Sequence, residues 1–183
     1  MKNILISSIL GLSLFACASH KEETPAVVSA PVWDPAPPTP NTPQVSSSSV
    51  ISGDTWRFTV PGNWQKINID NEPTIKAVYG NPDIKGLVIL EQEKFDGKID
   101  DYAQLTASAI VHQGGNLVGS QQTSINNINY YVIIGIKNEA TLTLWSTVID
   151  GYAYNLTCGG PTSSAVVAES CRSIANSFSI LKQ

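Results

Sequence analysis

The sequence predicts an α+β fold in which an antiparallel sheet is covered by helices. Three observations carry this prediction. Apolar and polar residues alternate in short segments from Trp56 onward, the period becomes helical after Ile99, and a second helical stripe lies near the end of the chain. Turn sequences separate the alternating segments, as expected for a meander of antiparallel strands.

The first half of the domain is predicted to hold strands only. Trp56, Phe58 and Val60 alternate with polar residues, the period-two pattern of a half-buried strand, and a Pro-Gly-Asn turn follows. Further strands are expected at residues 65–69, 74–79 and 86–92. The continuous apolar run Leu87–Leu90 predicts burial on both faces of the sheet.

A helix is predicted to begin at Ile99, because apolar residues then recur every three or four positions up to Ile110. Asp100 and Asp101 fall in its first turn, where negative charge suits the helix dipole. Gly114 and the glycine after it are a typical helix end. Strands are expected after it at residues 117–124, 128–136, 140–149 and 152–158, the last two joined by the hairpin signal Asp-Gly.

The last predicted element is a helix with Val167, Cys171, Ile174 and Phe178 on one stripe. Cys171 would then face the sheet whose last strand ends at Cys158. We expect a disulfide between the two, which would stabilise the fold by about 3 kcal/mol. A metal site or a redox pair is the alternative, but metal ligation needs further His or Cys nearby and redox cysteines are usually closer in sequence.

The N-terminal segment has the order of a secretory signal. Lys2 precedes the apolar stretch Ile4–Phe15, which is shorter than the roughly 20 residues that cross a bilayer. The stretch ends in Leu-Phe-Ala-Cys at positions 14 to 17, which resembles the lipobox of bacterial lipoproteins, although Phe15 replaces the usual small residue. An ordinary signal peptide cut after Ala16 or Ala18, with a chance cysteine, is the alternative.

The lipobox resemblance implies lipid attachment at Cys17: a diacylglyceryl group on its sulfur, cleavage before it, and an acyl chain such as palmitate on the new amine. Stable anchoring takes more than one acyl chain, and this modification supplies two or three. Because Ala18 follows the cysteine, the family's sorting rule favours the cell outer membrane facing the periplasm, with the inner membrane as the alternative. Cys158 and Cys171 then remain as a pair in a compartment where disulfides persist.

Between the signal and the domain, the sequence predicts a disordered tether. This stretch is rich in proline and serine, with little and aperiodic apolar content, and Pro-rich chains extend by about 3.1 Å per residue. The expected organisation is a signal at residues 1–16, the lipidated cysteine and tether at 17–50, and the domain at 51–183. Trp33 is the large apolar residue of the tether and is interpreted as an exposed tail residue; a partner anchor is the alternative.

Three segments carry a second resemblance: Phe58–Trp64 with its Phe-x-Val-Pro-x-x-Trp pattern, Ile125–Tyr130, and Ile174–Phe178. Together they are similar to the PsbP/DcrB-like fold, an α/β sandwich also found in a nuclear Ran-GTPase release factor. The resemblance covers residues 53 to 181, although Asn127 stands where family members often have glycine. It implies a protein that binds other proteins and is not an enzyme.

Catalytic and cofactor motifs are not found in the sequence. His112 is the one histidine in the predicted domain, and its place near a helix end is ordinary. The acidic segment Glu91–Asp101 lacks the rhythm of a calcium loop and is interpreted as a solvated loop leading to the helix. We expect no metal and no cofactor, and the mild net charge of −4 without a basic run argues against nucleic acid as a partner.

Three functions remain open from the sequence. The favoured one is a non-catalytic, membrane-anchored periplasmic module that binds or assembles an envelope protein of unknown identity. A hydrolase acting on envelope material would need the carboxylates of Glu91–Asp101 to meet His112 in one pocket. Capture of a small apolar ligand would need a large apolar cavity between helix and sheet.

Overall fold

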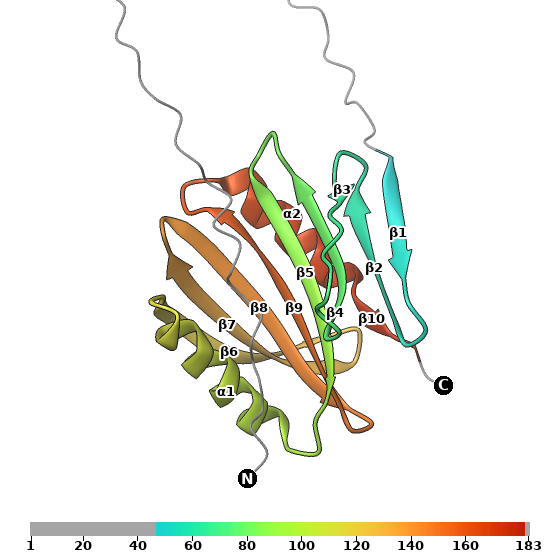
Figure 1. Cartoon of the computed structure of the whole chain (residues 1–183), viewed down its shortest axis with the longest axis vertical. Helices are drawn as coiled ribbons and strands as arrows, with labels where there is room; N and C mark the ends of the chain where they lie inside the picture. The colour runs from blue at the N-terminus through green and yellow to red at the C-terminus, as the bar shows by residue number, and fades with distance from the viewer. Residues whose placement is uncertain (1–46, 182–183) are drawn as a thin grey trace, which may run out of the picture.

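The structure, a computed structural model, describes residues 47–181 (Figure 1). The two helices of this part are α1 (Ile99–His112) and α2 (Ala165–Ser177). Its strands are β1 (Ser48–Ser52), β2 (Trp56–Pro61), β3 (Gln65–Lys66), β4 (Ile75–Asn81), β5 (Gly86–Lys94), β6 (Asn116–Ile125), β7 (Ile128–Lys137), β8 (Ala140–Ile149), β9 (Tyr152–Pro161) and β10 (Ser179–Ile180). The predicted α+β class with an antiparallel sheet covered by helices is confirmed.

Seven strands form the large sheet in the order β3-β4-β5-β9-β8-β7-β6, and every neighbouring pair is antiparallel. The small sheet has the order β1-β2-β10. Strands β6 to β9 are a meander, and β5 joins it at β9. The single helical crossover, α1, therefore runs from the middle of the large sheet to its β6 edge (Figure 1).

Both faces of the large sheet are covered, each by a different helix. On one face, α2 and β2 enclose the main core, which includes Phe58, Leu156 and Ile174. On the other face, α1 contacts β6, β7 and β8 and encloses a smaller core with Ile133 and Leu144 (Figure 1). Because successive strand residues point to opposite faces, this double coverage explains why β5 and β9 are apolar or buried along most of their length.

Three hairpin turns of the meander have two consecutive residues with positive φ, the geometry of a type I′ turn. One is the predicted pair Asp150 (φ 51°) and Gly151 (φ 76°). Another is Asn126 (φ 52°) and Asn127 (φ 62°), so asparagine adopts here the backbone that glycine favours. The Asn126 side-chain amide also donates to the carbonyl of Phe178 at 3.2 Å, which ties this turn to the end of α2.

The predicted pair Cys158–Cys171 is joined by a disulfide that links β9 to α2. Both residues are buried, at 1% and 4% exposure, in the main core. Ser164 caps α2 by accepting from the backbone N–H of Val167 at 3.3 Å. The predicted apolar stripe of this helix is buried as expected, with Phe178 just beyond the last turn.

The structure differs from the prediction at three places near the strand ends. Ser48–Ser52 forms β1 and pairs with β2, so residues 48–50 begin the domain although they were assigned to the tether. Its mostly exposed serine-rich sequence has no alternation, and only pairing with β2 makes it a strand. The strand expected at 65–69 is limited to Gln65–Lys66, and β9 extends to Pro161, three residues past its predicted end.

Candidate functional site

The acidic segment does not form one solvated loop, which corrects the interpretation from sequence. Glu91 and Glu93 lie on β5, and Glu91 is only 7% exposed. Glu93 accepts a hydrogen bond from the Tyr102 hydroxyl at 3.0 Å, and the Asp101 carboxylate accepts from the backbone N–H of Lys98 at the start of α1. Within this segment, only residues 95–98, between β5 and α1, form a loop. The carboxylates therefore lie on different elements and have different hydrogen-bond partners.

His112 does not join these carboxylates. It is exposed in the last turn of α1, whereas Asp100 lies in the first turn. Twelve residues separate them, which is about 18 Å along a helix axis. His112 and the carboxylates of the acidic segment therefore do not form the shared pocket that acid–base hydrolysis would need.

A row of buried polar side chains crosses the centre of the large sheet. Glu91, Asn155 and Ser146 occupy paired positions on β5, β9 and β8. The Asn155 amide donates to Glu91 Oε2 at 3.0 Å, and the Ser146 hydroxyl donates to Asn155 Oδ1, also at 3.0 Å. The same amide group approaches the Thr157 hydroxyl at 3.4 Å. Asn155 and Ser146 are fully buried, so these bonds satisfy groups that water cannot reach.

Burial raises the pKa of Glu91 to about 7, because desolvation disfavours the charged carboxylate. The hydrogen bond from Asn155 offsets part of this rise, and the nearby charges of Glu93 and Glu72 add to it. Such a carboxyl group changes charge near neutral pH. Because Asn155 holds this carboxyl group in the buried row, we expect its ionisation to change the stability of the fold.

An open groove lies between α1 and the β6–β7 part of the sheet. Its volume is about 410 Å³. The buried lining residues, Ala103 and Ile133, are apolar. The exposed ones, Asp100, Gln104 and Ser120, are polar and form the rim. Its lining residues are Asp100, Ala103, Gln104, Ala107, Ser120, Tyr131 and Ile133.

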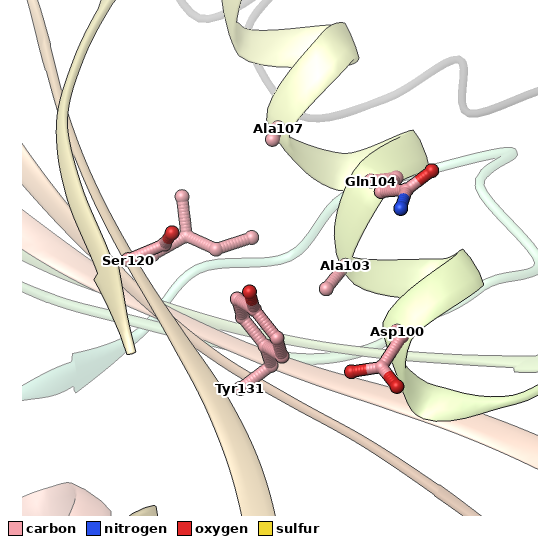
Figure 2. A pocket seen from close by; sticks show the side chains of 7 residues that line it. Asp100, Ala103, Gln104, Ala107, Ser120 and Tyr131 are labelled. Carbon is pink, nitrogen blue, oxygen red and sulfur yellow. The ribbon is translucent and has the colours of Figure 1, made fainter. Parts of the chain in front are cut away.

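Figure 2 shows how the groove is built. The Tyr131 ring stands between the helix and the strand that carries Ser120, with Ala103 and Ala107 on the helix side. Alanines at these two positions leave room next to the ring, because a larger side chain would fill the space. At the rim, the Gln122 amide donates to Asp100 Oδ1 at 2.9 Å and fixes the end of the groove.

The two adjacent tyrosines of β7 lie on opposite faces of the large sheet. Because neighbours on a strand face opposite sides, Tyr130 and Tyr131 cannot both enter one core. Tyr130 is 1% exposed in the main core, whereas Tyr131 is half-buried in the groove on the other face. Tyr131 therefore belongs to the groove, which depends on packing between α1 and strands far along the chain.

Other predicted site residues are placed as follows. The expected lipid-attachment residue Cys17 and the tether residue Trp33 lie outside the described part of the chain. Asn155, which begins an apparent glycosylation sequence, is fully buried in β9. Across residues 47–181, no group of three or more His, Cys, Asp or Glu side chains is arranged to hold a metal ion. Neither helix of this part has the length and apolarity to span a membrane.

Comparison with known proteins shows similarity of structure only. No protein-family model matches the sequence, and no curated protein sequence matches it. The solution structure of cyanobacterial PsbP (CyanoP) from Synechocystis sp. PCC 6803 is similar, with a TM-score of 0.60 and 13% identity, over 78% of this chain and 97% of that one. The domain therefore has the PsbP-like fold that its sequence resembles.

Two further structures are similar at lower TM-scores. A crystal structure from Bacteroides thetaiotaomicron has a TM-score of 0.47 and 16% identity, over 75% of this chain and 49% of that one. The crystal structure of LpqN, a protein involved in cell envelope biogenesis of Mycobacterium tuberculosis, has a TM-score of 0.47 and 13% identity, over 77% of this chain and 88% of that one.

Proposed function

We propose that this PsbP-like domain is the binding module of a lipid-anchored envelope protein, and that it acts by holding another protein and not by catalysis. In this proposal Cys17 carries the lipid, the outer membrane is the site of attachment, and the domain faces the periplasm. The proline-rich segment after Cys17 would then act as a spacer between the membrane and the domain.

The groove between α1 and β6–β7 is the observation that carries the binding proposal. Its half-buried Tyr131 ring and small alanines are surrounded by the polar groups of Asp100, Gln104 and Ser120. An apolar centre with a polar rim is typical of protein–protein interfaces, and a tyrosine at the centre is the kind of residue that contributes most to such contacts.

The arrangement of the acidic groups supports a non-catalytic role. Glu91, whose pKa is raised to about 7, is engaged with Asn155 in the buried polar row. The groove itself contributes one carboxylate, Asp100, whose oxygen accepts from Gln122. A glycosidase would need two carboxyl groups that face each other across the substrate.

The test is to block the groove and recover bound proteins from cells. The full-length protein is crosslinked in intact bacteria and then captured from membranes. Wild type is compared with Ala107→Trp, in which the indole is designed to fill the space beside Tyr131. Ala168→Trp is the matched control, because Ala168 is exposed on α2, away from the groove.

We expect wild type and Ala168→Trp to recover the same protein, and Ala107→Trp to lose it. Equal recovery by all three variants would show that the groove is not the binding surface. Repeated capture of no protein by wild type would contradict the binding function. A small apolar molecule recovered with wild type, and lost in Ala107→Trp, would favour ligand capture instead.

A further inference from the structure

The edge of the large sheet at β6 is long and carries no charge. Proteins usually shorten an edge strand or place charges on it, because its open N–H and C=O groups can pair with another chain. Among the described strands, β3 at the opposite edge has two residues and includes Lys66, whereas β6 has ten. No Asp, Glu, Lys, Arg or His occurs from Gln113 to Ile136. After one irregularity next to Leu117, Gly119–Ile125 pairs regularly with β7 on its inner side.

The groove beside α1 runs along this edge. Its α1 wall consists of Asp100, Gln104 and Ala107, which are spaced as one stripe of a helix. Val111 is the next position of that stripe and is 53% exposed. The stripe therefore begins with a carboxylate and ends with an exposed aliphatic side chain.

The opposite wall belongs to β6. Ser120 lines the groove, and Gln122 donates its hydrogen bond to the first turn of α1. Leu117 pairs with Gly135, and Ile110 of α1 packs where a side chain of Gly135 would project. Because paired residues share a face of the sheet, Leu117 lies on the α1 face, and it is 45% exposed.

The two walls match in length. Asp100 and Val111 are eleven positions apart on α1, which is about 16 Å. Leu117 and Gln122 are five positions apart on β6, which is also about 16 Å. One end of the groove therefore carries a carboxylate and an amide, and the other carries two exposed aliphatic side chains.

We propose that β6 adds an antiparallel strand from the partner protein, with a lysine or arginine opposite Gln122 and an aliphatic residue beside Leu117. This inference rests on the binding function proposed above and names the chemistry of the partner. The antiparallel direction continues the pattern of the large sheet, in which every neighbouring pair is antiparallel.

A strand suits this surface because it pairs the open backbone groups of Gly119–Ile125, and a helix laid in the groove would leave them unpaired. An added strand lies about 4.8 Å beyond β6, and its side chains on the α1 face stand next to Ser120 and Gln122. A long cationic side chain opposite Gln122 reaches Asp100. A carboxylate can accept about four hydrogen bonds, so Asp100 can bind this cation and keep its bond from Gln122.

The first test measures binding of a labelled peptide to full-length protein purified from membranes, by fluorescence anisotropy. The probe is Thr-Lys-Thr-Ala-Thr-Leu-Thr, whose alternation places lysine, alanine and leucine on one face. In the antiparallel register its lysine lies opposite Gln122 and its alanine opposite Ser120. We expect binding at low ionic strength, and about tenfold weaker binding when glutamate replaces the lysine. No binding of the lysine peptide would overturn the proposal.

Backbone methylation tests whether the peptide binds as a strand. Successive residues of a strand direct their N–H groups to opposite edges, so methylation of alternate nitrogens blocks one edge only. One peptide is methylated on lysine, alanine and leucine, and the other on the three threonines between and after them. We expect one of the two to bind like the parent and the other not to bind. Equal affinities of the two methylated peptides would be incompatible with strand addition.

Exchange of the charge on α1 tests the role of Asp100. Asp100→Lys should reverse the preference, so that the glutamate peptide binds better than the lysine peptide. Glu169→Lys is the matched control, because it makes the same change of net charge at an exposed position of α2. Should Asp100→Lys fail to fold, Asp100→Asn should bind both peptides equally. An unchanged preference in the Asp100 variants would overturn the proposal.

Capture from intact cells separates this inference from the proposed function. The strand predicts that the protein lost by Ala107→Trp is also lost by Asp100→Lys and is recovered by Glu169→Lys. Full recovery by Asp100→Lys, together with loss by Ala107→Trp, would leave the binding function standing and would contradict the cationic strand.

Discussion

At the scale of single residues, Glu91 is the position where sequence and structure differ most. In the sequence it is the first member of an acidic segment, although the strand predicted at residues 86–92 includes it and the apolar run Leu87–Leu90 comes directly before it. In the structure it faces a row of polar groups that come from β8 and β9, more than fifty residues later. A carboxyl group on the inside of a strand needs such partners, and they are visible only after the strands are paired.

The raised pKa of Glu91 predicts a specific pH dependence of stability. Its folded-state pKa of about 7 lies above the ordinary value of 4.5, so the folded protein binds this proton more tightly than the unfolded chain does. The contribution is fully present below pH 4.5 and is lost as pH rises through about 7. The free energy of unfolding should fall by on the order of 2–3 kcal/mol over this range.

Glu91→Gln should remove this part of the pH dependence, because the amide cannot ionise. Urea unfolding at a series of pH values gives the comparison with wild type. Glu169→Gln is the control, since Glu169 is exposed on α2 and pairs only with Arg172 at the surface. A wild-type curve that stays parallel to that of Glu91→Gln from pH 4.5 to 8 would show that Glu91 is not held as described.

At the scale of elements, periodicity predicted the strands and helices that bury an apolar face. The alternation in β2 and the stripe of α2 are visible in the sequence because each element has one face in the core. The strand β1 has no such face, and it exists because β2 offers an edge to pair with. The short β3 likewise depends on its contact with β4 and not on its own pattern.

The disulfide between β9 and α2 predicts a loss of stability that can be measured. Replacing both Cys158 and Cys171 by alanine should lower the free energy of unfolding by about 3 kcal/mol, because the unfolded chain is no longer closed into a loop. Urea unfolding of the oxidised wild type, the reduced wild type and the double variant gives the comparison. Cys17→Ser should unfold like wild type, and equal midpoints for all forms would contradict a stabilising disulfide.

At the scale of the whole molecule, both faces of the large sheet are covered, and the groove lies where one of these covers is incomplete. Figure 1 shows α2 and the small sheet on one face and α1 on the other. The first pair completes the main core, whereas α1 leaves a groove beside β6. The sequence predicted the layers, because each helix has its own stripe. The groove could not be predicted, because it is formed by Asp100, Ser120 and Tyr131 from three separate elements.

In the function proposed above, the domain works at a membrane to which its own chain is anchored. The most direct measurement is the intact mass of full-length protein expressed in bacteria and purified from membranes, compared with Cys17→Ser. We predict that the mature wild type begins at Cys17 and carries the added mass of a diacylglyceryl group and an acyl chain, whereas Cys17→Ser carries no lipid and leaves the membrane fraction. A wild-type mass equal to that of the bare polypeptide would contradict the claim.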